Sequence, residues 1–521
     1  MKFVVLGDVG LKSLYHVGDE AMTEVAVEML RDHDPEQITL VVGDPETATA
    51  QYGLPAVKRI GFSPGWTRRQ SNDKLARETS AASLDNAKPG SVAAAVRNAD
   101  AVVIAGGGNM TSRYAHHLYE RVAITRMAKY YGKPLLVTSQ TVGPVLRAAD
   151  EDLLGEIVEY ALLFGARDDD SFALLHRIGG QRASPVVQRT ADDAVLLDSD
   201  PSTRASDSSL SARYIVASFT SDRGTTDLSQ DEYQASIAET LKTLADQLDA
   251  DVLLVPHTGA PGGDPTGDEV SDAAIVELAA HPRVRALRVG TARETAALCA
   301  GAVLCVSTRY HSAVFSLAAS TPTVAVSLSF YSTVRFRGAM APLGLDAYIV
   351  PASAWDEIVP AAIDAVQRWR TIESRVRMTT EGRRAAQRAW WAAMIDSARE
   401  GHVRSLPEFP TLSLPPIAEE WSDAAGHAFL AFDAESRERT RTEWMRRDIA
   451  LLEQAVDKGA DDVARETAAR VHAERSAETL RRRVNVLESR KVVRIANRLT
   501  AMARTARRAA SPSNPANEAK K

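Results

Sequence analysis

The sequence predicts a two-domain α/β protein with an α-helical C-terminal extension, and three observations support this prediction. Short apolar runs alternate with helical patterns in residues 1–200 and again from residue 210 onward, which is typical of parallel sheets covered by helices. A Ser-rich stretch at residues 201–209 separates the two halves. From about residue 354 the pattern is almost wholly helical. A chain of 521 residues is also too long for a single hydrophobic core.

The first domain is expected to span residues 1–200. Amphipathic helices are expected at residues 19–31 and 118–131, between strands at residues 3–6, 38–42, 101–104, 135–138, 162–166 and 185–188. Residues 61–90 are polar and weakly patterned, which favours a long loop at the mouth of a binding site.

The second domain is expected to span residues 210–400, with closing helices at its end. Its predicted helices are residues 230–247, 269–280, 291–300 and 312–319, and its predicted strands are residues 214–219, 252–255, 284–287, 302–306 and 323–327. Two such domains place the default ligand site in the cleft between them.

Composition excludes several classes of protein. A net charge of -6 argues against a general nucleic-acid binder, and two cysteines provide neither a disulfide framework nor zinc-like spacing. The N-terminus has no signal-peptide pattern, and no apolar run approaches the ~20 residues of a membrane span, so we expect a cytoplasmic protein. The 11 histidines are scattered. Because the adjacent His116 and His117 are expected to diverge on a helix, no metal site is predicted.

The most informative segment is Ser-Thr-Arg-Tyr-His at residues 307–311. It follows an apolar run and opens a helical pattern, so it lies where a strand enters a helix, a common ligand position in α/β sheets. Arg309 and His311 would bring a fixed cation and a titratable group to a helix N-terminus suited to anions. The alternative is that Arg309 lies on the surface and that His311 caps the helix or packs in the core.

Three other predicted strand ends carry candidate site residues. Gly-Gly-Gly-Asn, ending at Asn109, forms either a binding loop or a structural turn. Arg167 can clamp a carboxylate or phosphate, or form an ion pair with one of the acidic residues 168–170. Asp19 and Glu20 follow the glycines after the first strand, where Asp19 can also N-cap the helix. The glycine spacing is not G-x-G-x-x-G, so no dinucleotide site is expected.

Taken in order, these segments resemble the polysaccharide pyruvyl transferase family over about residues 1–395. The resemblance rests on residues 17–21, 106–109, 139–144, 166–168 with Ser171, 191–194, 307–312 and 320–324. It implies two Rossmann-like domains arranged as in GT-B glycosyltransferases. It also implies a reaction that moves pyruvate from phosphoenolpyruvate onto two sugar hydroxyls as a cyclic ketal and releases phosphate.

The resemblance also implies roles for particular residues. His311 is the candidate general acid, or else a phosphate ligand, and Arg335 stands where many relatives carry a lysine. No cofactor or metal is implied besides phosphoenolpyruvate as co-substrate. The implied donor-binding residues are Arg167, Arg309, Tyr310 and Arg335, and the implied acceptor-binding or basic residues are Asp19, Glu20 and Asn109.

Two other functions remain open at this point. One is a nucleotide-sugar glycosyltransferase on the same GT-B-like architecture, although the sequence shows no clear nucleotide-binding signature. The other is a non-catalytic scaffold for the assembly of envelope polysaccharides, with the helical extension as its working part.

The extension is expected to be helical or coiled coil over residues 417–510, followed by a disordered tail at residues 511–521. Residues 481–508 contain ten Arg or Lys and one acidic residue. The apolar residues 492, 495, 499 and 502 form one stripe of a basic helix. Residues 440–508 would therefore mediate either self-association or peripheral contact with the inner face of a membrane, where saccharide acceptors can be lipid-linked.

Overall fold

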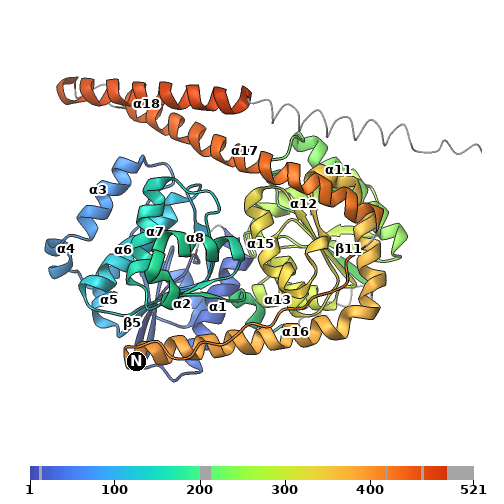
Figure 1. Cartoon of the computed structure of the whole chain (residues 1–521), viewed down its shortest axis with the longest axis horizontal. Helices are drawn as coiled ribbons and strands as arrows, with labels where there is room; N and C mark the ends of the chain where they lie inside the picture. Colours follow the sequence, from blue (N-terminus) through green and yellow to red (C-terminus); the bar gives the residue numbers. More distant parts are fainter. Residues whose placement is uncertain (11–13, 200–212, 418, 459–462, 490–521) are drawn as a thin grey trace, which may run out of the picture.

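Two parallel β-sheets, one in each half of the chain, form the framework of the protein (Figure 1). The computed structural model describes all residues except 11–13, 200–212, 418, 459–462 and 490–521. The predicted linker at residues 201–209, the stripe at residues 492–502 and the tail at residues 511–521 therefore lie outside the described residues.

The N-terminal sheet has the strand order β4-β3-β1-β5-β7-β8-β9, with β6 paired to β7. Its strands carry near-continuous apolar runs because helices cover both faces, and every residue of β5 and β7 is buried. The strands are β1 (Lys2–Leu6), β3 (Gln37–Val42), β4 (Ala56–Lys58), β5 (Ala101–Ile104), β6 (Gly107–Met110), β7 (Leu135–Val142), β8 (Leu163–Ala166) and β9 (Val187–Arg189).

Helices connect these strands and cover the sheet. They are α1 (Val17–Arg31), α2 (Pro45–Tyr52), α3 (Arg68–Glu78), α4 (Ala81–Asp85), α5 (Val92–Asn98), α6 (Ala115–Tyr130), α7 (Ala148–Tyr160), α8 (Asp169–Gly179) and α9 (Ala183–Val186). Short 3-10 helices occupy Gly180–Arg182 and Asp193–Leu196.

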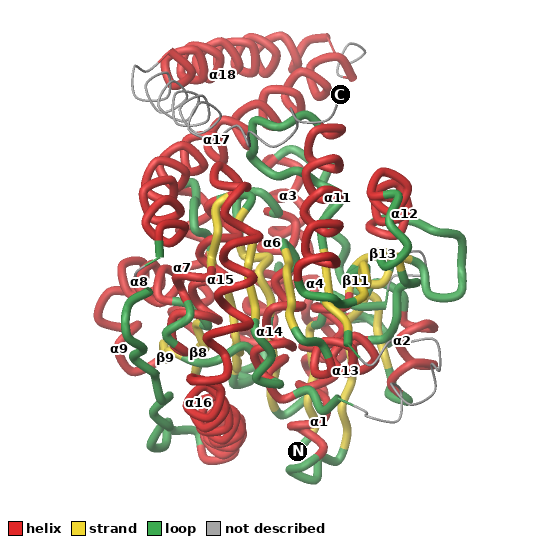
Figure 2. Tube along the Cα trace, turned by 90° about the vertical axis from the view of Figure 1, so that its right-hand side faces the viewer, coloured by secondary structure: helices red, strands yellow, loops and turns green. Residues whose placement is uncertain are grey.

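The C-terminal sheet has the order β13-β11-β10-β14-β15-β16, and Figure 2 shows strands enclosed by helices when the molecule is turned. The strands are β10 (Tyr214–Ser218), β11 (Asp251–Leu254), β13 (Val284–Ala286), β14 (Leu304–Ser307), β15 (Thr323–Ser327) and β16 (Ile349–Pro351). The helices are α11 (Gln230–Gln247), α12 (Asp268–Ala279), α13 (Ala292–Gly301), α14 (Tyr310–Ala318) and α15 (Phe330–Met340), with 3-10 helices at Ala341–Leu343, Asp346–Tyr348 and Ala352–Glu357.

The predicted strands and helices agree with these elements to within a few residues, but the loop predicted at residues 61–90 is wrong. This segment contains α3 and α4, whose signals are caps and not apolar periodicity. Thr67 forms a capping box with Gln70, and Ser80 caps α4. Only Ser71 and Leu75 of α3 are buried, so the helix carries almost no hydrophobic pattern.

A small two-stranded sheet joins the domains. It pairs β2 (Tyr15–His16) of the first domain with β12 (Thr258–Gly259) of the second in antiparallel fashion. The backbone N–H of Val17 also donates to the carbonyl of His257 at 3.0 Å. The start of α1 is therefore fixed directly to the C-terminal domain.

The helix α16 (Ile358–Glu400) ends at the predicted boundary but contacts both domains. It starts on the C-terminal domain and runs along the bottom of Figure 1 to the N-terminal domain. There the side chains of Gln387 and Trp391 donate to the buried Asp193 at 2.7 and 2.8 Å. The end of this helix thus packs on the first domain.

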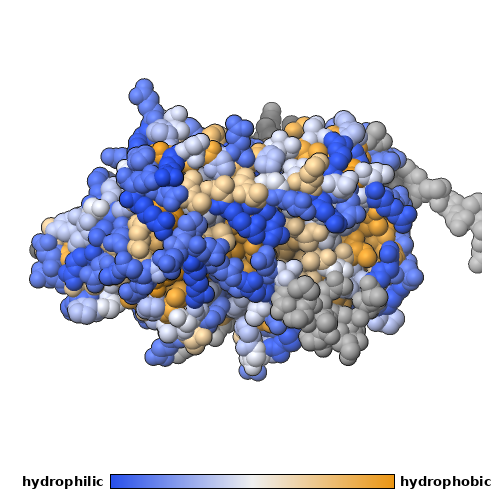
Figure 3. Space-filling view, turned by 90° about the horizontal axis from the view of Figure 1, so that it is seen from below, coloured by the Kyte–Doolittle hydropathy of each residue, from blue (hydrophilic) through white to orange (hydrophobic). Residues whose placement is uncertain are grey.

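From below, the molecule presents a mostly hydrophilic surface interrupted by smaller apolar areas (Figure 3).

The extension forms two helices, α17 (Glu420–Lys458) and α18 (Val463–Ser489), which contact each other. Helix α17 crosses both domains, with an ion pair between Arg337 and Asp433 on the C-terminal side and one between Arg147 and Asp448 on the N-terminal side. Within the described part of the chain, no helix has the length and apolarity that a membrane crossing requires.

Candidate functional site

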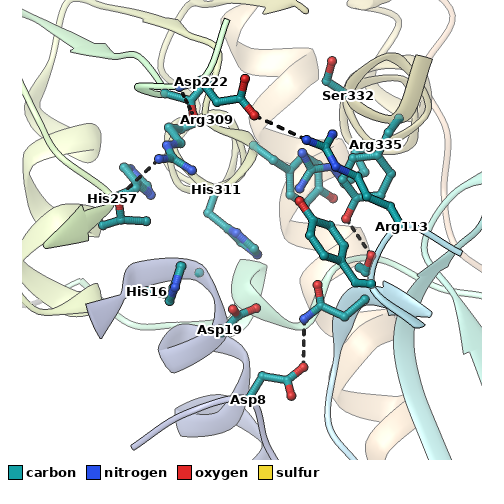
Figure 4. A pocket seen from close by; sticks show the side chains of 18 of the residues that line it. Asp8, His16, Asp19, Arg113, Asp222, His257, Arg309, His311, Ser332 and Arg335 are labelled. Carbon is teal, nitrogen blue, oxygen red and sulfur yellow. Dashed lines mark hydrogen bonds and ion pairs between the residues drawn. The ribbon is translucent and has the colours of Figure 1, made fainter. Parts of the chain in front are cut away.

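A cavity of about 450 Å³ lies between the two domains, at the ends of strands from both sheets (Figure 4). Its walls come from the starts of α1, α6, α14 and α15 and from the glycine-rich segment after β5. Among its lining residues are seven of the predicted site residues: Asp19, Asn109, Arg167, Arg309, Tyr310, His311 and Arg335.

Glu20 is the predicted site residue that the structure does not bring to the cavity. Its carboxylate accepts hydrogen bonds from the Tyr52 hydroxyl at 2.5 Å and from Gln51 at 2.8 Å. Since consecutive residues point in different directions on a helix, Asp19 faces the cavity while Glu20 fastens α1 to α2.

Arg167 is fully buried at the end of β8. Its Nη1 donates to Asp192 at 2.5 Å and its Nε to Thr141 at 2.9 Å. The alternative of an ion pair with residues 168–170 is therefore wrong, because the carboxylate of Asp168 caps α8 instead. The guanidinium also lies 4.8 Å from the centre of the Tyr310 ring, so Tyr310 forms part of the arginine-rich wall.

Arg335, in α15, also contacts Tyr310, with its guanidinium 5.3 Å from that ring and 4.2 Å from the ring of Tyr331. Its Nε is buried without a hydrogen-bond partner, and within the described residues no carboxylate forms an ion pair with it. The contacts of its charged group among the described residues are with aromatic faces. Arg335 is therefore a cation with hydrogen-bonding capacity left for a ligand.

Arg309 precedes α14 as its N-cap residue. Its guanidinium forms an ion pair with the buried Asp268 and donates to the Thr258 hydroxyl at 3.3 Å. The side chain is 24% exposed, so it is not a free surface arginine. Its Nε is buried and has no partner among the described residues.

His311 occupies the first turn of α14 and packs against the first turn of α1. A Cβ atom added to Gly18 would lie 1.8 Å from Nδ1 of His311, so only glycine leaves room for this ring. Nε2 lies 3.8 Å from the carboxylate of Asp192 and makes no hydrogen bond within the described residues. Burial lowers the pKa of His311 to about 3, so the imidazole is neutral at pH 7 in the unliganded protein.

Asp19 faces His311 from α1 (Figure 4). The helix begins at Val17 with His16 as its N-cap, so Asp19 does not cap it. Burial, and then the charge of Asp8, raises the pKa of Asp19 to about 7. A carboxyl group with this pKa exists in both protonation states near neutral pH, which suits proton transfer.

Asp8 fixes the environment of Asp19 and was not predicted. Its carboxylate accepts hydrogen bonds from Asn109 at 2.8 Å and from His117 at 3.0 Å, and it pairs with Arg121. Burial would raise the pKa of Asp8, but Arg121 and His117 hold it well below its usual value. Asp8 is therefore a permanent negative charge, and its position just beyond β1 is the sequence signal that marks it.

The two adjacent histidines were also misjudged, because both line the cavity and their ring centroids are 4.2 Å apart. Burial, and then the proximity of His117, lowers the pKa of His116 to about 3.

Across the same cavity, Arg113 and Asp222 form an ion pair at 3.3 Å that bridges the two domains. Within the described chain, no group of three or more His, Cys, Asp or Glu side chains is arranged to hold a metal ion.

Glycines of the segment after β5 permit close contact between the domains. A Cβ atom on Gly108 would lie 2.4 Å from the hydroxyl oxygen of Tyr331. Because Gly108 has no side chain, this hydroxyl can approach and donate to the Gly108 carbonyl at 2.6 Å. The glycine-rich segment is therefore both a turn and a wall of the cavity.

Comparison with known proteins gives one family match. A family model described as polysaccharide pyruvyl transferase matches residues 16–329, a range that contains the predicted site residues except Arg335. A search of curated proteins finds no match.

Three solved structures illustrate the structural similarity. A putative UDP-N-acetylglucosamine 2-epimerase from Listeria monocytogenes aligns with a TM-score of 0.50 at 12% identity, covering 79% of this chain and 99% of that one. The MnaA–UDP structure from S. aureus gives 0.49 at 10% identity (78% and 99%), and Anabaena HepE with UDP and glucose gives 0.46 at 16% (77% and 99%). The Listeria likeness shows the fold alone, two Rossmann-like domains of the GT-B type.

Proposed function

The chain belongs to the polysaccharide pyruvyl transferase family, and from this premise we propose that it transfers pyruvate from phosphoenolpyruvate to a sugar of a cell-envelope polysaccharide or exopolysaccharide, or to its precursor. The pyruvate would become a cyclic ketal on two hydroxyls, with release of phosphate. One observation carries the proposal: Arg167, Arg309 and Arg335 converge with His311 and Asp19 on a single cavity between the domains.

The arrangement of the arginines supports a small donor with two anionic groups. Phosphoenolpyruvate carries a carboxylate and a phosphate, and guanidinium groups bind both in bidentate fashion. Arg335 has no acidic partner among the described residues, and the Nε atoms of Arg309 and Arg335 are buried without hydrogen bonds. Both arginines line the cavity, so their guanidinium groups can bind the anionic groups of phosphoenolpyruvate.

The proposed reaction needs an acid and a base. A proton added to the methylene carbon of phosphoenolpyruvate creates an oxocarbenium-like centre, which a sugar hydroxyl attacks while losing its proton to a base. Phosphate then leaves with the C–O bonding electrons, the second hydroxyl adds to the same carbon, and its proton goes to the solvent or to phosphate. The scheme consumes one phosphoenolpyruvate and two sugar hydroxyls and forms one ketal and one phosphate.

We assign the base role to Asp19, because its pKa of about 7 lets it accept a proton at neutral pH. His311 is the proposed acid at the methylene carbon. Burial lowers its pKa to about 3 in the unliganded protein, but an anionic phosphate beside the imidazole would raise that pKa. Binding of phosphoenolpyruvate would therefore favour the protonated form of His311, which the transfer of a proton to the methylene carbon requires. Cytoplasmic location and a lipid-linked acceptor belong to the same proposal.

The test is thermal unfolding with phosphoenolpyruvate and, separately, with UDP-glucose and UDP-N-acetylglucosamine. A ligand at a hundredfold excess over its Kd stabilises the folded state by about 2.7 kcal/mol. Phosphoenolpyruvate should stabilise the wild type and an Arg69→Ala control, whose side chain is 82% exposed, but not Arg335→Ala. Stabilisation by a nucleotide sugar and not by phosphoenolpyruvate would instead establish the glycosyltransferase alternative.

A further inference from the structure

A second cavity, of about 170 Å³, lies beside the first, between α17 and the N-terminal domain. The two cavities share Arg113 and His116 as lining residues, so they adjoin each other. Other lining residues of the second cavity are Trp66, Arg68, Tyr119, Arg147, Trp444 and Arg447.

One wall of this cavity is formed by α17, which lies beyond the family match at residues 16–329. The helix is held firmly at this point. Arg147 forms an ion pair with Asp448 and donates to the Trp444 carbonyl at 3.2 Å. Arg447 donates to the carbonyls of Arg113 at 2.8 Å and Pro64 at 2.9 Å. These contacts fix α17 against the N-terminal domain and so define the cavity between them.

Three of the four arginines that line the second cavity have an acidic partner, and the fourth, Arg447, donates to backbone carbonyls. Arg68 forms an ion pair with the fully buried Asp150, and Arg147 forms one with Asp448. In the first cavity, by contrast, Arg335 makes neither an ion pair nor a hydrogen bond within the described residues. Paired arginines present hydrogen-bonding groups with little net charge, which favours a neutral ligand with hydroxyl groups over a phosphate.

The lining also offers aromatic surface and a free donor. Trp66 and Trp444 contribute indole rings with polar edges, the combination that accommodates the apolar faces and the hydroxyls of a sugar ring. Tyr119 is buried, and its hydroxyl donates to Asn72 at 2.6 Å. The indole Nε1–H of Trp444 is buried and has no hydrogen-bond partner among the described residues. A buried donor left unpaired is costly, so a ligand oxygen at this place would satisfy it.

We propose that the second cavity is an acceptor subsite, which binds the neutral sugar residue next to the one that is pyruvylated. This inference rests on the proposed function, since the pyruvylated sugar occupies the first cavity beside the donor. Through α17, the helical extension thereby selects acceptors that are at least disaccharides.

The experiment measures binding of disaccharides of glucose, galactose, mannose and N-acetylglucosamine to the full chain by calorimetry, without phosphoenolpyruvate. The main variant is Trp444→Phe, which keeps a ring beside Arg147 but removes the indole donor. Trp66→Ala is the second variant. The matched control on the same helix is Leu430→Ala, because Leu430 is 78% exposed. Thermal unfolding verifies that every variant folds.

We expect at least one disaccharide to bind the wild type and Leu430→Ala equally. Trp444→Phe should weaken that binding by about threefold to tenfold, as expected for one net hydrogen bond, and the matching monosaccharide should not respond to the substitution. The subsite is refuted if no disaccharide binds, or if neither tryptophan variant weakens binding. It is also refuted if inorganic pyrophosphate binds the wild type and Trp444→Phe abolishes that binding, since the cavity would then be an anion site.

The donor measurement stands apart from this one. Suppose that phosphoenolpyruvate fails to stabilise the wild type while disaccharide binding still depends on Trp444. The saccharide subsite is then supported and the proposed pyruvyl transfer is refuted. If phosphoenolpyruvate binds and Trp444 proves irrelevant to saccharides, only the subsite is lost.

Discussion

The contact between Gly18 and His311 allows a sharp test of the cavity, through the substitution Gly18→Ala. The added Cβ would lie 1.8 Å from Nδ1 of His311, whereas nonbonded carbon contacts are normally about 3.5 Å or longer. The ring must therefore retreat by about 1.7 Å, or the domains must separate. Because a misplacement of about 1 Å can reduce a rate about 100-fold, kcat/KM should fall at least that far.

Stability should respond much less than activity. Alanine is favoured over glycine inside a helix by about 1 kcal/mol, while overpacking costs about 1–3 kcal/mol, so a net loss of at most about 2 kcal/mol is expected. The assay combines phosphate release from phosphoenolpyruvate with urea unfolding. The matched control is Gly155→Ala in α7, where the nearest atom, on Ile178, would be at an ordinary 3.5 Å. This control should be slightly more stable and fully active.

The double variant Gly18→Ala/His311→Ala identifies the cause of the loss. With the ring removed, alanine at position 18 should cost no stability relative to His311→Ala alone. The reasoning is refuted if Gly18→Ala retains activity within twofold of the wild type. It is equally refuted if the stability cost of Gly18→Ala persists in the double variant.

Two further predictions concern titration and charge pairing. Burial raises the pKa of Asp19 to about 7, so between about pH 4 and 7 the folded state holds a proton that the unfolded state has released, and stability falls as pH rises. Asp19→Asn should therefore unfold at a higher temperature than the wild type at pH 8, with a difference that disappears near pH 4; an unchanged difference would contradict this pKa. Arg167→Ala leaves the carboxylate of Asp192 buried without its partner, so urea unfolding should show a loss of about 3–5 kcal/mol. Arg335→Ala should cost about 1 kcal/mol, since it loses cation–π contacts and leaves no acid unpaired. Equal losses for the two variants would contradict the assignment of Arg335 as a cation without an acidic partner.

Much of the fold follows from the sequence because buried parallel strands leave continuous apolar runs. The strands at residues 101–104 and 323–327 were predicted with the bounds that the structure has. Helix α3 was not predicted, since it buries almost no side chain and begins with the capping pair of Thr67 and Gln70. Hydrophobic periodicity detects only elements that contribute to a core.

Site residues that follow a strand end could be predicted from the sequence. This rule found Arg167, Arg309 and Asp19, because parallel strands place their carboxyl ends at one edge. It could not find their partners, since the Arg309–Asp268 ion pair joins residues 41 positions apart and the Asn109–Asp8 hydrogen bond joins residues 101 apart. Such pairings depend on tertiary packing, which no local pattern encodes.

The path of α17 was likewise beyond the sequence pattern, although its helicity was not. Asp433 is paired with Arg337 of the C-terminal domain, and Asp448 is paired with Arg147 of the N-terminal domain. An α-helix rises 1.5 Å per residue, so these two anchors stand about 22 Å apart on one rigid element. The same helix is therefore anchored to both of the domains that enclose the cavity. A segment outside the family match thus helps to set the geometry in which the family's own residues meet.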